Sequence, residues 1–168
     1  GDMLELGEFS KQLHENVGDE VVKNDVDILI TVGKEAKNIY QKSIDYGIEG
    51  ADAFFMLAKC FEREEQHKLA LPFMQRAAEL APEDLQIRLS YGILLCSLEM
   101  FEYAEKELQF VIDEDWNNAD AHYNLGVLYA VSTQNIDGAK YHLKQAFTLQ
   151  PEFDQARYIY DMICQRDN

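Results

Sequence analysis

A pattern of about 34 residues recurs along this chain and limits its possible folds more than any other feature. Ala70, Ala104 and Ala139 recur at this interval, with one extra residue before the last alanine. Before each alanine stands a pair made of a large and then a small residue: Leu57-Ala58, Tyr91-Gly92 and Leu125-Gly126. Three positions after the small residue of each pair comes a large residue: Phe61, Leu95 and Tyr129. Repeats of this length are helix pairs that bury their apolar faces by stacking, so the sequence predicts a row of stacked helix pairs.

The spacing has a physical reason in helix packing. A small residue in the middle of one helix lets its antiparallel neighbour approach closely, while large residues fill the space alongside. Near the end of each unit, at the same interval after its alanine, stand Pro82, Trp116 and Pro151. A proline just beyond a helix prevents its continuation. The one extra residue of the third unit is expected in the turn Ser132–Asn135, where an insertion costs little.

The repeat resembles the tetratricopeptide repeat, and Ala121–Pro151, which reads AHYNLGVLYA…GAKYHLKQAFTLQP, is close to that family's consensus. Ala58 replaces the usual glycine and Trp116 the terminal proline, and both changes preserve the pattern. The resemblance implies a mainly α-helical, TPR-type α-solenoid of three helix–turn–helix repeats, with a short α/β fragment before it and a capping helix after it. The expected domains are residues 1–50, 51–84, 85–118, 119–153 and 154–168.

Both ends of the repeat array are expected to be capped. Lys34–Tyr46 matches the second helix of an incomplete leading repeat, because Ala36 lies one repeat interval before Ala70. We expect it to dock on the first helix of residues 51–84. At the other end, Asp154–Cys164 is amphipathic and would cover the apolar end of the last repeat, as terminal caps do in solenoids. Its apolar side is formed by Ala156, Ile159, Tyr160 and Ile163.

Residues 1–40 have a different resemblance. The sequence GDMLELGEFSKQLHENVG…VDILITVGKEAK resembles the C-terminal domain of the Mur ligase that joins D-alanyl-D-alanine to UDP-N-acetylmuramoyl-tripeptide. In that family the loop corresponding to Asp2–Gly7 lies near the nucleotide and substrate cleft, which implies a role for Asp2, Glu5 and His14. The matching residues are Gly1-Asp2-Met3, Glu5-Leu6-Gly7, His14, Val17-Gly18, Asp27–Gly33 and Ala36-Lys37.

Catalysis is not expected from this sequence. The phosphate loop GxxxxGK[ST] of the Mur ligases is missing, because Gly33-Lys34 lacks the earlier glycine and is followed by Glu35. The histidines have no metal-binding spacing, and no serine or cysteine stands beside a base, so no catalytic residue, metal or cofactor is predicted. The apolar segment Ile28–Val32 reads as a strand that needs a partner. Three arrangements are expected for this strand: pairing with Met3–Leu6, pairing with a second copy of the chain to give a homodimer, or conversion to helix. Of these, pairing between copies is favoured.

Charge and cysteine content exclude other classes of protein. The net charge of −16 would repel nucleic acid and anionic membranes. No apolar run approaches the roughly 20 residues of a membrane span. Cys60, Cys96 and Cys164 have no metal or redox spacing and read as buried hydrophobes in a reducing compartment. We therefore expect a cytoplasmic protein.

The resemblance implies a non-catalytic module that binds a peptide or partner protein in a concave groove lined by the first helices. We expect a ligand with apolar side chains and neutral to basic character, because Asp120 would repel an acidic tail. The residues expected in the lining are Phe55, Lys59, Glu62, Arg63, Gln86, Leu89, Ile93, Cys96, Ser97, Asp120, Tyr123, Asn124, Val127 and Ala130. The alternatives are an accessory fragment of a peptidoglycan-precursor ligase, or an engineered structural fusion without a ligand.

Overall fold

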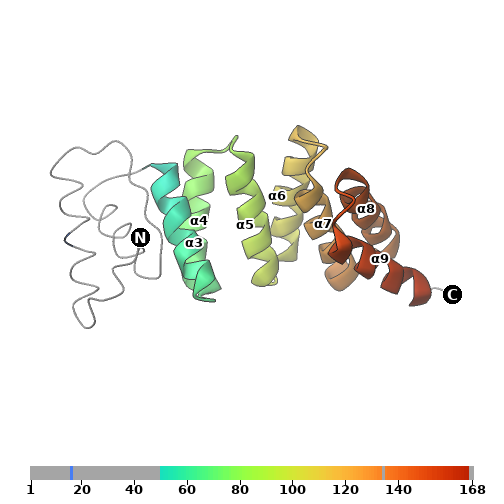
Figure 1. Cartoon of the computed structure of the whole chain (residues 1–168). Helices are drawn as coiled ribbons and strands as arrows, with labels where there is room; N and C mark the ends of the chain where they lie inside the picture. The colour runs from blue at the N-terminus through green and yellow to red at the C-terminus, as the bar shows by residue number, and fades with distance from the viewer. Residues whose placement is uncertain (1–15, 17–49, 134, 167–168) are drawn as a thin grey trace. The chain divides into compact units, whose positions relative to one another are not determined.

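The computed structural model describes Asn16, residues 50–133 and residues 135–166 (Figure 1). Apart from Asn16, the Mur ligase-like segment lies outside these described residues, as do Ile28–Val32 and Lys34–Tyr46. The chain divides into two compact units, Gly1–Pro82 and Glu83–Asn168.

Helices are the only regular elements in the described residues, which confirms the prediction of a mainly helical fold. Consecutive helices pair within each repeat: α3 with α4, α5 with α6, and α7 with α8. The first unit contains α3 (Ala51–Arg63) and α4 (His67–Leu80). The second unit contains α5 (Leu85–Ser97), α6 (Phe101–Glu114), α7 (Ala119–Leu128), the π-helix η2 (Tyr129–Thr133), α8 (Ile136–Leu149) and α9 (Asp154–Arg166).

Small residues bring the two helices of a pair close together, as the repeat pattern predicts. A Cβ atom added at Gly92 would lie 2.9 Å from Leu108 Cγ, and one added at Gly126 would lie 2.8 Å from Leu143 Cγ. Cβ atoms essentially never approach other atoms this closely, so a larger residue at either crossing would require neighbouring atoms to shift. The alanines that define the repeat on the second helices are fully buried: Ala70, Ala104 and Ala139.

The turn inside the first two repeats has the same geometry. Glu65 and Glu99 both adopt the left-handed conformation, with φ of 58° and 59°. In the second repeat the N–H of Glu99 donates to the carbonyl of Cys96 at 3.0 Å, and the N–H of Met100 donates to the carbonyl of Leu95 at 2.9 Å. This is a Schellman motif, in which a left-handed residue lets the chain satisfy the last carbonyls of the helix.

The third repeat leaves its first helix differently. The prediction that its extra residue lies in the turn Ser132–Asn135 is wrong, because the helix continues as η2, Tyr129–Thr133. A π-helical turn forms hydrogen bonds from i to i+5 and so holds one residue more than an α-helical turn. The insertion is therefore absorbed within the helix rather than in the turn that follows it.

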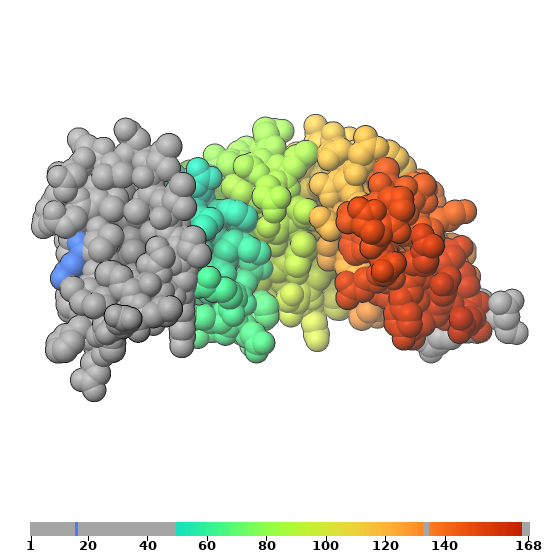
Figure 2. Space-filling view, viewed as in Figure 1, coloured from blue at the N-terminus to red at the C-terminus, as the bar shows by residue number. Residues whose placement is uncertain are grey.

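The last helix packs on the third repeat at the C-terminal end of the second unit (Figure 2). Ala156 of α9 is fully buried in a cluster with Leu143 and Ala146 of α8. The apolar side predicted for this helix is the side that packs against the cluster, through Ile159, Tyr160 and Ile163. Burial of this side covers the end of the last helix pair.

Candidate functional site

On α3, two of the four predicted binding residues are exposed and two are half-buried. Lys59 and Arg63 are exposed, whereas Phe55 and Glu62 are half-buried. The Nζ atom of Lys59 lies 2.7 Å from Glu62 Oε2, so its charge is already paired within the same helix. A carboxylate ligand would have to compete with Glu62 for this ammonium group.

On α5, the predicted residues differ widely in exposure. Gln86 and Ser97 are exposed, and Ile93 and Cys96 are half-buried. Leu89 is only 7% exposed, so it packs between helices and offers a partner little surface. Burial raises the pKa of the Cys96 thiol to about 11. Cys96 is therefore an uncharged thiol at neutral pH, without the thiolate that a nucleophile or metal ligand requires.

On α7, the predicted residues form a partly buried surface held by neighbouring side chains. The rings of Tyr123 and Phe153 lie 4.7 Å apart, and Val127 packs against the cluster around Leu143. The side-chain Nδ2 of Asn124 donates to the backbone carbonyl of Asp120 at 2.8 Å. Their positions are thus fixed by packing and hydrogen bonding, which limits the ordering entropy lost when a partner binds.

Two exposed residues of α9, absent from the expected lining, lie at the repeat positions that Tyr123 and Val127 occupy on α7. Tyr158 is 67% exposed and Met162 is 46% exposed. Tyr158 corresponds to Tyr123 and Met162 to Val127, because each pair is separated by the same interval as the first residues of α7 and α9. The repeat interval, continued beyond Pro151, is the signal that would find them, whereas the amphipathic pattern of α9 indicates only a cap. In the structure one side of α9 packs on α8, and these two residues lie outside that contact.

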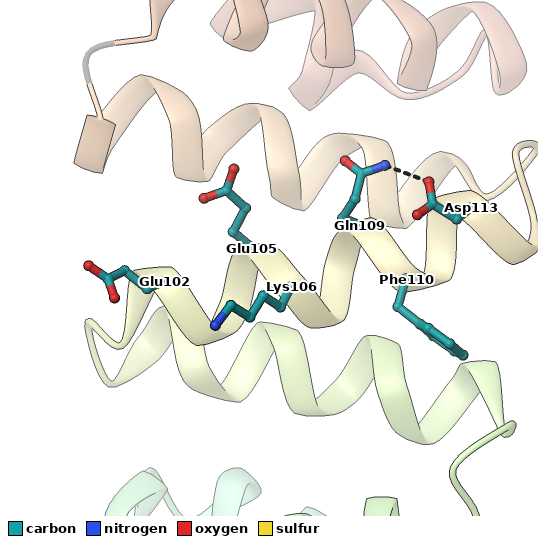
Figure 3. Close-up of a pocket in the computed structure, with 6 residues that line it drawn as sticks. All are labelled: Glu102, Glu105, Lys106, Gln109, Phe110 and Asp113. Carbon is teal, nitrogen blue, oxygen red and sulfur yellow. Dashed lines mark hydrogen bonds between the residues drawn. The ribbon is translucent and has the colours of Figure 1, made fainter.

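A separate open pocket lies on the second helix of the second repeat (Figure 3). Gln109 Nε2 donates to Asp113 Oδ1 at 2.7 Å, and the hydroxyl of Tyr129 donates to Glu105 Oε1 at 2.7 Å. Burial and the contact with Glu105 raise the pKa of Tyr129 to about 12, so this hydroxyl stays protonated. Two of the acidic groups are therefore engaged by neighbouring side chains. The residues lining the pocket are Glu102, Glu105, Lys106, Gln109, Phe110 and Asp113.

The described parts of the chain show neither a metal site nor a membrane span. No three His, Cys, Asp or Glu side chains among those residues are grouped so that they could hold a metal ion. Within the same ranges, no helix combines the length and apolar character needed to cross a membrane.

The helix pairs match a known family of repeats. A model of the tetratricopeptide repeat matches residues 51–84 and residues 119–153. These ranges are the first and third predicted repeats. The second repeat, where Trp116 stands at the position of Pro82 and Pro151, has the same helix pair but is not matched.

Solved structures of such repeat proteins have the same fold. A structure described as YrrB, a TPR protein with an unusual peptide-binding site, is 33% identical, with a TM-score of 0.74 over 94% of this chain and 78% of that chain. MamA from Desulfovibrio magneticus RS-1 is 15% identical, with a TM-score of 0.74 over 94% and 85% of the two chains. The first TPR of Spaghetti (RPAP3), bound to the HSP90 peptide SRMEEVD, is 15% identical, with a TM-score of 0.65 over 71% and 98%.

Proposed function

Because this chain belongs to the tetratricopeptide repeat family, we propose that it is a non-catalytic module that binds a peptide or a partner protein. The proposed binding surface is the face formed by α5, α7 and α9 of the second unit, because the first helices of such pairs line a groove in solenoids. One observation carries the proposal. Tyr158 and Met162 are exposed on α9 at the repeat positions that Tyr123 and Val127 occupy on α7.

The second unit therefore has an apolar pair at the same two repeat positions of three helices. We call these residues the inner stripe: Leu89 and Ile93 on α5, Tyr123 and Val127 on α7, and Tyr158 and Met162 on α9. Exposure increases along the stripe, from buried Leu89 to largely exposed Tyr158. Aromatic residues and methionine are enriched in binding surfaces, because aromatic rings bury a large area with few rotatable bonds and the flexible methionine side chain adapts to its partner. The α7–α9 part of the stripe is the strongest candidate for contact with a partner.

The expected partner is a peptide with apolar side chains and neutral to basic character. Asp120 and Asp161 are exposed on the same two helices, and the chain has a net charge of −16, so an acidic peptide would be repelled. The side-chain nitrogen of Asn124 donates a hydrogen bond to the backbone carbonyl of Asp120, and its side-chain oxygen could accept a hydrogen bond from a backbone N–H of the peptide. Lys59 is paired with Glu62 and would clamp a terminal carboxylate poorly. The peptide SRMEEVD of the RPAP3 complex is therefore not the chemistry expected here.

A peptide array tests both the surface and the ligand chemistry. We expect the wild-type chain to select apolar, neutral or basic peptides, and Tyr158→Asp/Met162→Asp to weaken their binding at least about tenfold. The matched control is Tyr103→Asp, because Tyr103 is 58% exposed on α6, outside the first helices. Preference for acidic C-terminal peptides, or equal loss of binding in the control, would contradict the proposal.

A second candidate function comes from residues 1–40, which resemble the C-terminal domain of a Mur ligase. On this alternative the chain is an accessory part of a peptidoglycan-precursor ligase, with Asp2, Glu5 and His14 near the ligand. A ligand at about 100 times its Kd stabilises the folded state by roughly 2.7 kcal/mol. A rise in melting temperature with ATP or a UDP-muramyl peptide would support this alternative. An unchanged melting temperature would favour the binding module.

The proposal also includes the cellular location, the domain division and the oligomeric state of the chain. We place the chain in the cytoplasm, where its three cysteines would stay reduced. We divide it into an N-terminal fragment (1–50), three repeats (51–84, 85–118 and 119–153) and a capping helix (154–168). Pairing of Ile28–Val32 between two copies would make a homodimer. Sedimentation of the full chain and of a chain that starts at Gly50 would test this, since the longer chain alone should dimerise.

A further inference from the structure

The two repeats of the second unit join their helices through a polar side-chain pair at equivalent positions. In the second repeat, Arg88 Nη1 on α5 lies 2.7 Å from Glu107 Oε2 on α6. The residues at the same positions one repeat later are His122 on α7 and His142 on α8, and their Nδ1 atoms lie 2.9 Å apart. The third repeat thus has two imidazoles where the second repeat has an ion pair.

The histidine pair is enclosed by aromatic rings. His122 is fully buried and His142 is 9% exposed. Trp116 meets His122 edge-on at 4.9 Å, and Tyr141 meets His142 edge-on at 5.0 Å. The ring of Tyr129 lies 5.7 Å from that of His142. A positive charge on either imidazole would therefore lose most of its hydration.

The hydrogen bonds fix which nitrogen of each ring carries the proton. The Nε2 atom of His122 lies 3.1 Å from the carbonyl oxygen of Trp116, which only accepts, so Nε2 carries a hydrogen. In the neutral ring Nδ1 of His122 is then an acceptor, and Nδ1–H of His142 donates to it. A proton added at Nε2 of His142 places a charge in the cluster. A second proton, at Nδ1 of His122, would set two N–H groups against each other and break the contact.

No charged side chain of the described residues forms a hydrogen bond with either ring. The hydrogen bonds of the two rings are to each other and to the Trp116 carbonyl, and no carboxylate of the described residues accepts from them. Glu105 on α6 is engaged by the Tyr129 hydroxyl, and Asp115 accepts from the N–H of Asn117. The other charged residues on the elements that form the contact are Asp120 on α7 and Asp137, Lys140 and Lys144 on α8.

The direction of the pKa shifts agrees with this geometry. Burial, and next the charge that His122 would carry, lower the pKa of His142 to about 4. Burial also lowers the pKa of His122, opposed by its bond to the Trp116 carbonyl. A histidine in an unfolded chain has a pKa of about 6.5, so below that pH the unfolded chain binds more protons. The contribution of the pair to stability is therefore complete above about pH 6.5 and is lost as the pH falls toward 4.

We propose that the His122–His142 contact makes the third repeat a pH-sensitive element, closed when both rings are neutral and opened as the pH falls from about 6.5 toward 4. Opening separates α7 from α8, whereas the second repeat keeps its Arg88–Glu107 ion pair. Because α7 carries Tyr123 and Val127, acidification would also disrupt the middle of the inner stripe. This consequence for binding rests on the proposed function, but the opening itself does not.

Hydrogen exchange of the full chain at pH 7.5 and pH 5.0, corrected for the intrinsic exchange rates, tests the proposal. We expect protection of the amides in α7 and α8 to fall at least about tenfold at pH 5.0, while α5 and α6 change less. Trp116 is the only tryptophan of the chain, so its fluorescence gives a second readout. Emission should decrease as an imidazolium forms beside the indole, with a midpoint between about pH 4 and 6.5.

Two double variants separate the histidines from other acid effects. His122→Arg/His142→Glu introduces the residue pair of the second repeat, and His122→Phe/His142→Phe introduces the residue types found at Phe54 and Phe73 in the first. Either variant that folds at pH 7.5 should keep its α7–α8 protection at pH 5.0 and lose the fluorescence transition. Equal acid loss of protection in wild type and variant, or earlier loss in α5 and α6, would overturn the proposal.

Discussion

At the scale of single residues, two glycines occupy the same position of consecutive repeats but tolerate change differently. A Cβ added at Gly92 would meet the side chain of Leu108, at 2.9 Å from Cγ. One added at Gly126 would also meet backbone atoms, at 3.0 Å from the nitrogen of Leu143 and 3.3 Å from the oxygen of Ala139. A leucine side chain can move aside, whereas helix backbone moves only if the whole crossing shifts.

We therefore predict that Gly126→Ala lowers the free energy of unfolding by about 1–3 kcal/mol, through overpacking. This loss should appear although alanine is the better helix former by roughly 1 kcal/mol. Urea denaturation measures the effect, and Gly92→Ala is the matched comparison, with a smaller expected loss. Equal losses in the two variants would contradict the role of the Leu143 backbone.

The left-handed residues of the turns give a second prediction at this scale. Glu99 has φ of 59°, a conformation that costs a residue with a Cβ roughly 1–2 kcal/mol. Glu99→Gly relieves this strain but increases the entropy of the unfolded chain. We expect a net stabilisation of about 0.5–1 kcal/mol in urea denaturation. Glu102→Gly, in the first turn of α6, is the control and should be destabilising, by less than the roughly 1 kcal/mol of a glycine in a helix interior. A destabilised Glu99→Gly would show that the side chain matters more than the strain.

At the scale of elements, the helix pairs follow from the sequence, whereas the irregular features do not. The buried alanines and glycines recur at a fixed interval, because every pair makes the same close crossing. The π-helix η2 has no such signal, since an extra residue can be placed in the turn or in the helix without changing the pattern. The His122–His142 contact also needs coordinates, because a histidine on a helix is compatible with many partners.

The position of α9 leads to a prediction at this scale. Ala156 is fully buried against α8, so Ala156→Arg would place a charge within an apolar contact. We expect α9 to detach, with a loss of roughly 2–4 kcal/mol in stability and a decrease in helical circular dichroism. Tyr158→Arg, at the exposed side of the same helix, should leave both unchanged. An Ala156→Arg protein with wild-type stability would show that α9 does not cap the third repeat.

At the scale of the whole molecule, a negatively charged chain carries an apolar inner stripe. Four of the six stripe residues, Leu89, Ile93, Tyr123 and Val127, belong to the lining expected from the sequence, at two repeat positions of α5 and α7. The packing of the second unit buries Leu89, and a helical pattern does not distinguish a lining residue from one packed between helices. The expected lining omitted Tyr158 and Met162, because a terminal helix can pack on one side and remain open on the other.

The face of α5, α7 and α9 in the second unit is the surface proposed to bind the partner. The most direct test is to titrate the isotopically labelled chain, by NMR, with a basic, apolar peptide selected by the array. Peptide contact should shift the amide signals of α7 and α9 most strongly and those of α5 next, because the inner stripe lies on these helices. Shifts concentrated on α4, α6 and α8, or around the pocket of Glu102 and Asp113, would contradict binding at the first helices.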